Sequence, residues 1–300
     1  MPKPIDALTL FRQAGMEPDA WQTQMLTCPA RQQLWLAHRQ FGKSSCVAAL
    51  AWEQACTVPG SLTLLISRSQ RQASELFRKV KQFVHSTPGA RLIRDTELSL
   101  ETPTGSRIVS LPASPDTVVG YTAPTLIITD EAARVPDALY YALRPMLAMS
   151  RGRLIALSTP WGQRGWFYEA WAGIAREDAP MDAHTAQRLL ADLGMAIPET
   201  LVGPGQEGAF AWERIQVAAP DNPRIHPFFL ANERRSVPDL IFRSEWLVEF
   251  VAASGTVFDY TDLQAMLSED LTPLWIAETS ASLQALRQDL PALFSQGVAL

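Results

Sequence analysis

Short runs of consecutive apolar residues alternate with segments of helical periodicity along the first half of the chain. The runs LWLA, LTLLIS, TLIITD and RLIALS occupy residues 34–37, 62–67, 125–130 and 153–158. Such continuous runs are typical of strands buried on both faces of a parallel sheet. The intervening segments SSCVAALAWEQAC, SQRQASELFRKVKQFVHS and PDALYYALRPMLAM predict helices. This alternation predicts an α/β fold with a mainly parallel sheet and right-handed crossovers.

Further segments complete the predicted organisation. Two short helices are expected before the first strand, one closed by Gly15 and one with Pro18 in its first turn. The segments ELSLET and SRIVSLP, separated by Pro-Thr-Gly, predict an antiparallel hairpin. Helical patterns in HPFFLANERR and PDLIFRSEWLVEF predict a smaller C-terminal unit. We therefore expect a core at 1–176, a proline- and glycine-rich linker at 177–212, the smaller unit at 213–260 and a tail at 261–300.

Composition restricts the class of protein. A chain of 300 residues with 47% hydrophobic residues can bury one large core, or a core and a smaller domain. No apolar run reaches the roughly 18 residues of a membrane helix, and the N-terminus lacks the order of a secretory signal. The three cysteines form no CxxC pair, which argues against a zinc knuckle or a disulfide framework. We therefore expect a cytosolic protein without a membrane partner.

The net charge of −5 conceals an asymmetry between the two parts of the chain. Residues 1–160 carry 17 Lys and Arg against 12 Asp and Glu, whereas residues 161–300 carry 9 against 19. A polyanion is expected to bind the first part.

The stretch LAHRQFGKSSC (36–46) has the context of a phosphate-binding loop, because it joins a predicted strand to a predicted helix. Backbone amides at a helix start can hold phosphate oxygens, and Gly42 permits close approach. Lys43 would reach the outer phosphates, and the Ser44 hydroxyl would bind Mg²⁺. Gln40 and Ser45 complete the expected nucleotide contacts. Since Ala37 stands where the usual pattern begins with glycine, an ordinary helix-capping turn remains the alternative.

The segment LIITDEAA places two carboxylates at the end of an apolar strand. In open α/β sheets, ligands bind at this edge. Asp130 would hold Mg²⁺, directly or through water, and Glu131 would orient and deprotonate the attacking water. A helix N-cap with an acidic first turn is the alternative. The position downstream of the phosphate loop favours the catalytic interpretation.

Two further groups are candidates for the same site. Ser158, Thr159 and Pro160 follow the last predicted strand and could sense the γ-phosphate, although a simple turn is the alternative. Gln22 offers a donor and an acceptor to an adenine edge, and Trp21 could pack beside it. A surface glutamine and a core tryptophan are the alternative for this pair.

The predicted helix SRSQRQASELFRKVK carries five basic residues against one acid, Glu75. Contact with DNA phosphates is one interpretation, and a solvated helix face is the other. The candidate DNA contacts are Arg68, Arg71, Arg78, Lys79 and Lys81.

With these motifs in order, residues 15–260 resemble the ATPase domain of the large terminase subunits, the DNA-packaging motors of tailed bacteriophages. That family has a deviant phosphate loop (Walker A) with Arg-Gln ahead of Gly-Lys-Ser/Thr, which HRQFGKS matches. The resemblance implies a RecA-like P-loop NTPase core of the ASCE (additional-strand) type with a lid at 213–260. It implies that Arg39 neutralises phosphoryl charge in cis and that Gln22 belongs to an adenine motif. It also implies a Walker B pair, Asp130 and Glu131, and a coupling motif at 158–160.

The resemblance further implies ATP hydrolysis with Mg²⁺ that drives double-stranded DNA into a procapsid. The expected partners are the small terminase subunit and the portal protein, and the expected location is the host cytoplasm, docked on the procapsid. Such motors work as homo-oligomeric rings, although the isolated chain could be a monomer. A neighbour would then supply an arginine, for which the candidates are Arg134, Arg144, Arg151 and Arg153.

Two departures from the family pattern limit these expectations. Val119-Gly120 stands where relatives often have Arg-Gly, so a charged contact is expected to be missing there. Only about 40 residues follow Phe258, and residues 271–300 contain two acids, Glu278 and Asp289. These are too few ligands for the two-metal nuclease site of the family, and we expect no nuclease activity in this chain. A helicase-like ATPase and a remnant that binds nucleotide or DNA without turnover are the alternatives.

Overall fold

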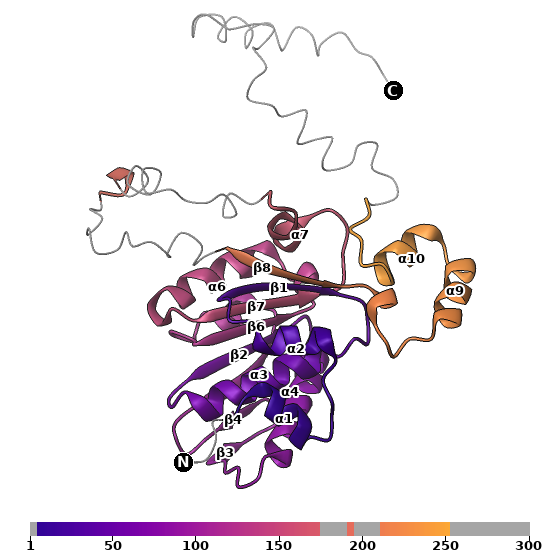
Figure 1. The fold of residues 1–300 in the computed structure, drawn as a ribbon. Helices are drawn as coiled ribbons and strands as arrows, with labels where there is room; N and C mark the ends of the chain where they lie inside the picture. Colours follow the sequence, from indigo (N-terminus) through magenta and orange to yellow (C-terminus); the bar gives the residue numbers. More distant parts are fainter. Residues whose placement is uncertain (1–4, 175–190, 195–210, 253–300) are drawn as a thin grey trace, which may run out of the picture. The chain divides into compact units, whose positions relative to one another are not determined.

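A computed structural model describes residues 5–174, 191–194 and 211–252. An eight-stranded sheet forms its centre, with the strand order β3-β4-β5-β2-β6-β7-β1-β8 (Figure 1). All strands from β5 to β8 in this order are parallel, and β3 and β4 extend the sheet in antiparallel pairing. The strands are β1 Gln32–Ala37, β2 Leu62–Ser67, β3 Arg94–Asp95, β4 Ser99–Glu101, β5 Arg107–Pro112, β6 Leu126–Asp130, β7 Arg153–Ser158 and β8 Trp212–Val217.

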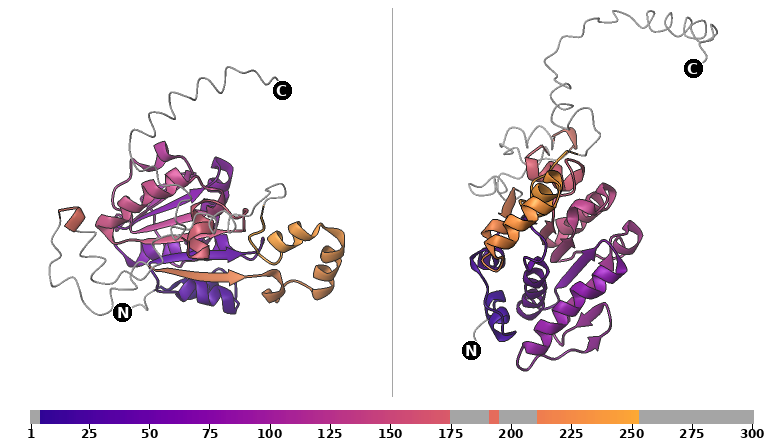
Figure 2. Two further views of the ribbon diagram at one scale, coloured as in Figure 1. Left: turned by 90° about the horizontal axis from the view of Figure 1, so that it is seen from above. Right: turned by 90° about the vertical axis from the view of Figure 1, so that its right-hand side faces the viewer.

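Helices cover both faces of the sheet (Figures 1 and 2). One layer contains α1 Ala7–Gln13, α2 Ala20–Thr27, α3 Lys43–Thr57 and α4 Gln70–Ser86. The opposite layer contains α5 Pro115–Val118, the 3-10 turn η1 Ala132–Arg134, α6 Asp137–Ser150 and α7 Gly165–Ala172. Beyond β8 follow the 3-10 turn η4 Ala219–Asp221, α9 Pro227–Ser236 and α10 Asp239–Glu245.

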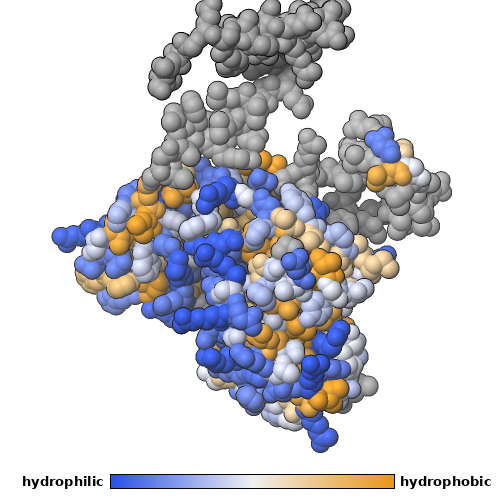
Figure 3. All heavy atoms as spheres, turned by 180° about the vertical axis from the view of Figure 1, so that it is seen from behind, coloured by the Kyte–Doolittle hydropathy of each residue, from blue (hydrophilic) through white to orange (hydrophobic). Residues whose placement is uncertain are grey.

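Alternate residues of each central strand belong to different cores. Trp35 and Ala37 of β1 pack with the α1–α4 layer, whereas Leu34 and Leu36 pack with the α6–α7 layer. Because both faces are buried, these strands are apolar at nearly every position. Seen from behind, much of the surface is hydrophilic, with hydrophobic residues in smaller patches (Figure 3).

The α/β class, the mainly parallel sheet and the predicted hairpin, which forms β4 and β5, are confirmed. The prediction for the second helix was wrong by two residues, since α2 begins at Ala20 and Pro18 lies before it. Asp19 is the N-cap: its side chain accepts the Gln22 backbone N–H, and the Gln22 side chain accepts the Asp19 N–H. This reciprocal capping box fixes the start of the helix more strongly than the proline does.

The strand β8 was not predicted, and it corrects the predicted boundary at residue 213. It pairs in parallel with β1 over its whole length, so the predicted smaller unit begins inside the core sheet. Its sequence WERIQV mixes buried and exposed positions instead of forming a continuous apolar run. Most of the predicted linker and the whole predicted tail lie outside the described residues. In the described part of the chain, no helix is long and apolar enough to cross a membrane.

Candidate nucleotide-binding site

The loop between β1 and α3 has the tight backbone of a phosphate-binding loop. Gln40 and Gly42 both have positive φ angles, 59° and 97°. A Cβ on Gly42 would lie 2.7 Å from Gln22 Nε2, so a side chain there would displace the end of the Gln22 side chain, and the positive φ itself favours glycine. The helix α3 begins at Lys43, immediately after this turn. Its first backbone N–H groups are therefore available to an anion at the helix start.

The Lys43 side chain is folded back over this loop. Its Nζ donates to the carbonyl oxygens of Ala37, at 2.6 Å, and His38, at 3.0 Å. Burial lowers the pKa of Lys43, while the nearby carboxylates of Glu131 and Asp130 oppose this shift. A phosphate at the helix start would offer the ammonium a charged partner in exchange for two carbonyls.

Ser44 and Asp130 meet where α3 begins and β6 ends. Ser44 Oγ lies 3.5 Å from Asp130 Oδ2, and Asp130 Oδ1 accepts the Glu131 backbone N–H at 3.0 Å. Burial raises the pKa of Asp130 to about 6, with a further contribution from Glu131, while Lys43 acts in the opposite direction. A hydroxyl and a carboxylate at this spacing are hard oxygen donors that fit Mg²⁺, which usually takes only one or two carboxylates from a protein.

The turn after β6 is joined to the end of β7. Glu131 has a left-handed backbone, with φ at 54°, and its Oε2 accepts from Arg134 Nη1 at 2.6 Å. Ser158 Oγ accepts the Ala133 N–H at 3.2 Å, and Arg134 Nη1 also donates to Thr159 Oγ1 at 3.2 Å. The structure therefore places the candidate water-activating carboxylate and the candidate coupling residues in one bonded cluster.

Arg39 makes a two-point ion pair with Glu245 at the end of α10. Its Nε donates to Oε2 at 2.5 Å and its Nη2 to Oε1 at 3.0 Å. These hydrogen bonds raise the pKa of Arg39, and burial opposes them. Planar contacts of this kind are among the stronger charged hydrogen bonds. The predicted cis arginine is thus held by the segment that the sequence assigned to a lid.

The side chains of Gln22 and Trp21 have structural roles. The amide of Gln22 accepts from Asp19 and donates to the Phe41 carbonyl at 3.4 Å, so both of its ends are occupied. Trp21 is half-buried and packs against the core of the α1–α4 layer. The structure brings Gln22 into contact with the loop, whereas adenine contact stays a prediction.

Three residues that the sequence did not single out support the loop. His38 Nε2 lies 3.1 Å from Asn222 Nδ2, and the pKa of His38 is lowered by burial. Arg224 Nη2 donates to Asp19 Oδ2 at 2.7 Å and to the Phe41 carbonyl at 3.0 Å. Both Asn222 and Arg224 follow β8. The parallel pairing of β8 with β1 places Asn222 and Arg224 beside the loop. Predicting β8 from the sequence would therefore have indicated these two residues.

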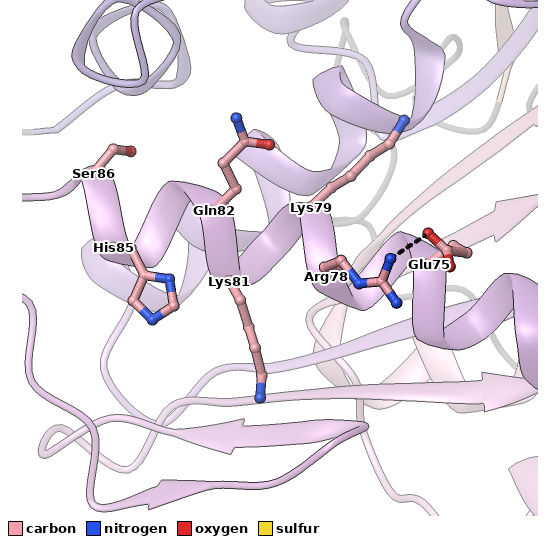
Figure 4. Close-up of a pocket in the computed structure, with 7 residues that line it drawn as sticks. All are labelled: Glu75, Arg78, Lys79, Lys81, Gln82, His85 and Ser86. Carbon is pink, nitrogen blue, oxygen red and sulfur yellow. Dashed lines mark hydrogen bonds and ion pairs between the residues drawn. The ribbon is translucent and has the colours of Figure 1, made fainter.

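The five candidate DNA contacts are not gathered on one face. Arg68 precedes α4 at the end of β2, and Arg71 and Arg78 lie on the exposed face of the helix. Lys81 points toward β3, where it pairs with Asp95 at 2.8 Å, while Lys79 points the other way (Figure 4). Arg78 pairs with Glu75 at 3.1 Å (Figure 4). A shallow pocket on this surface is lined by Glu75, Arg78, Lys79, Lys81, Gln82, His85 and Ser86.

The arginines proposed for action on a neighbouring subunit differ in position. Arg134 is bonded to Glu131 of its own chain. Arg153 begins β7, at the edge of the sheet opposite the loop, and donates to the Cys28 carbonyl at 3.1 Å. Arg151 lies just before this strand, and Arg144 lies on α6.

A parallel sheet with a glycine-lysine-serine loop after β1 and an acidic pair after the central strand β6 defines the class of P-loop NTPases. The family described as "Terminase large subunit, T4likevirus-type, N-terminal" matches residues 34–265, and the chain belongs to this family. By family it is an N-terminal domain of a terminase large subunit.

Individual relatives agree with this assignment. The large terminase subunit of Thermus virus P23-45 is 25% identical over 282 residues, which are 86% of this chain and 53% of that protein. The large terminase subunit of Thermus phage G20c is also 25% identical, with the same coverage. The chain thus spans about half the length of the curated relatives it matches.

Structures of terminases share the fold. The large terminase ATPase domain of Thermus phage P74-26 matches with a TM-score of 0.60 at 21% identity, covering 84% of this chain and all of that one. The large terminase of the thermophilic bacteriophage D6E, in complex with ATP-gamma-S, matches with a TM-score of 0.52 at 12% identity. This match covers 77% of this chain and 52% of that chain. The RecA-like ASCE fold expected from the sequence is thereby confirmed.

Proposed function

We propose that this domain binds ATP with Mg²⁺ and hydrolyses it to move double-stranded DNA into a procapsid. The observation that carries the proposal is the meeting of Lys43, Ser44, Asp130 and Glu131 at one edge of the sheet in a chain of the terminase family. A nucleoside triphosphate is held by an ammonium, the N-terminal turn of a helix and hard oxygen ligands for its metal ion.

Each residue takes a role that follows from its position. Lys43 exchanges its two carbonyl partners for the outer phosphates. Ser44 and Asp130 would hold Mg²⁺, and the chemistry that this ion would supply is neutralisation of negative charge on the phosphates. Glu131 orients the attacking water and accepts its proton. Arg39 leaves Glu245 to neutralise charge on the transferring phosphoryl group.

The coupling of hydrolysis to movement would run through two contacts of the site. Ser158 and Thr159 touch the turn that carries Glu131, so loss of the γ-phosphate changes the end of β7. Release of Arg39 to the pair with Glu245 changes the segment around α10. A switch of this kind requires each contact to have a second discrete arrangement in another nucleotide state.

The partners we propose are those of a packaging motor. They are double-stranded DNA, the small terminase subunit and the portal protein of a procapsid, with the domain working in a homo-oligomeric ring in the host cytoplasm. The exposed basic face of α4 supports DNA contact, because Arg71 has no ion-pair partner among the described residues and Arg78 pairs only with an exposed acid. Exposed pairs of this kind contribute little and are easily exchanged for a phosphate.

Nucleotide binding is tested by Lys43→Ala. We expect this variant to lose tight binding of ATP measured by calorimetry with Mg²⁺. The matched control is Lys81→Ala, which removes a lysine of α4 that pairs with Asp95 and should leave ATP affinity unchanged. Equal ATP affinity in the Lys43→Ala variant and the wild type would contradict the assignment of this loop.

DNA contact is tested through the salt dependence of binding. Replacing Arg71 and Arg78 by glutamine should reduce the slope of log affinity against log salt by about 0.9 for each phosphate that the variant no longer neutralises. Arg12 and Arg31 are exposed arginines near the N-terminus, and their double glutamine variant is the control for net charge. Equal slopes in the two double variants would show that Arg71 and Arg78 form a solvated helix face that does not contact DNA.

A further inference from the structure

Arg134 occupies an unusual position for an arginine in this protein. It ends the turn η1, three residues after Glu131, and only 10% of its side chain is exposed. Its Nη1 donates to Glu131 Oε2 at 2.6 Å and to Thr159 Oγ1 at 3.2 Å. One guanidinium nitrogen therefore joins the candidate water-activating carboxylate to the candidate coupling motif.

An aromatic ring holds the same guanidinium from another side. Arg134 Cζ lies 4.2 Å from the centroid of the Trp161 ring, within the range of a cation–π contact. Trp161 is 43% exposed and directly follows Pro160. Arg164 Cζ lies farther from the same ring centroid, at 6.0 Å. The position of Arg134 is thus determined by the segment after β7.

The backbone of this turn is fixed by other contacts, and the ion pair with Arg134 orients the Glu131 carboxylate. Glu131 has a left-handed conformation, which is uncommon for a residue with a side chain. The hydrogen bond that the Ala133 N–H donates to Ser158 Oγ fixes the turn to the end of β7. The ion pair with Arg134 then holds the Glu131 side chain above this turn. Lys43, Arg39 and Asp130 are the other charged groups near this carboxylate.

We infer that Arg134 is a positioning residue that acts within its own subunit. It orients the Glu131 carboxylate toward the attacking water and transmits movements of the Thr159–Trp161 segment to it. A general base usually has a third group that orients it, and Arg134 is that group here. This inference rests on the proposed ATPase function. It removes Arg134 from the arginines that could reach a neighbouring nucleotide, because only 10% of its side chain is exposed and its guanidinium is bonded to Glu131 and Thr159 of its own chain.

The first test is the effect of Arg134→Gln on kcat and KM for ATP. Misplacement of a catalytic group by about 1 Å costs on the order of 10²-fold, so we expect kcat to fall roughly 10- to 100-fold. KM and the affinity for ATP should stay within about twofold, because Arg134 does not touch the loop. Arg134→Lys, which keeps the charge, should recover part of kcat. Arg164→Gln is the matched control and should leave kcat unchanged.

A second variant protects the test against misfolding, since little of the Arg134 side chain is exposed. Trp161→Leu changes an exposed ring and removes the cation–π contact with Arg134. We expect kcat to fall by about two- to tenfold, while thermal unfolding stays cooperative and shows that the variant is folded. Unchanged kcat in both Arg134→Gln and Trp161→Leu would overturn the inference.

Mixing two variants with impaired turnover distinguishes action in cis from action in trans. Arg134→Gln keeps Glu131, and Glu131→Gln keeps Arg134. If Arg134 acted on a neighbour, mixed assemblies would regain turnover, and that result would overturn the inference; we expect no recovery. The wild type separates the two proposals. Absence of Mg²⁺-dependent turnover in the wild type contradicts the proposed function, whereas normal turnover in Arg134→Gln beside an active wild type contradicts only the role of Arg134.

Discussion

Replacing Gly42 by alanine tests whether the phosphate loop and Gln22 form one packed unit. Gly42 has φ at +97°, and a Cβ there would lie 2.7 Å from Gln22 Nε2. A left-handed conformation costs an L-residue about 1–2 kcal/mol. Moving the Gln22 amide would also weaken its hydrogen bonds to Phe41 and Asp19, each worth about 0.5–1.5 kcal/mol. The free energy of unfolding should therefore fall by about 2–4 kcal/mol.

Urea unfolding measures this loss, and a second glycine separates its two causes. Gly15 has φ at +75°, and a Cβ there would meet no atom within 4 Å, so Gly15→Ala should show only the backbone cost of about 1–2 kcal/mol. The double variant Gln22→Ala/Gly42→Ala removes the amide that the new methyl group meets. Its cost should be smaller than the sum of the two single variants by about 1 kcal/mol.

Two results would refute this reasoning. Equal losses for Gly15→Ala and Gly42→Ala would show that the Gln22 contact adds nothing. Strict additivity of Gln22→Ala and Gly42→Ala would show that the two residues are not in energetic contact. Either result would show that α2 and the phosphate loop do not stabilise each other through Gln22.

Two other predictions concern the supports of the loop. Glu245→Gln should release Arg39 and tighten ATP binding by up to about fivefold, since an exposed ion pair contributes about 0.2–1 kcal/mol. Glu249→Gln is the control, because Glu249 pairs with Arg243 instead. Weaker ATP binding in Glu245→Gln would contradict the role of the pair between Arg39 and Glu245. The pKa of His38 lies below its ordinary value of 6.5 in the folded protein, so the unfolded chain takes up this proton first and stability should fall as the pH drops below about 6.5. His38→Gln should make urea stability less dependent on pH in that range, and an unchanged slope would show that His38 does not titrate as expected.

The sequence predicts the parts of the site that depend on strand ends. Each predicted strand is buried, and parallel strands deliver their following residues to one edge, which is why Ser44 and Asp130 could be expected to meet. The order of motifs supplied the class of the fold. Only the spacing of these side chains required the structure.

The partners of the site residues could not be predicted, because they come from distant parts of the chain. Glu245 lies 206 residues from Arg39, and Arg224 lies 205 residues from Asp19. Both pairs depend on β8, whose mixture of polar and apolar residues gives a weaker signal than a continuous apolar run. Arg134 is close to Glu131 in sequence, but the contacts with Thr159 and Trp161 that define its role depend on the pairing of β6 with β7.

The central claim is that this domain hydrolyses ATP through Glu131, and ATP turnover tests it most directly. Mg²⁺-dependent turnover should be measured at high protein concentration, with and without double-stranded DNA, for the wild type and for Glu131→Gln. We expect wild-type turnover that DNA stimulates, and a loss of about 10²- to 10⁴-fold in the variant while ATP binding is retained. Equal turnover in the two proteins would contradict the claim.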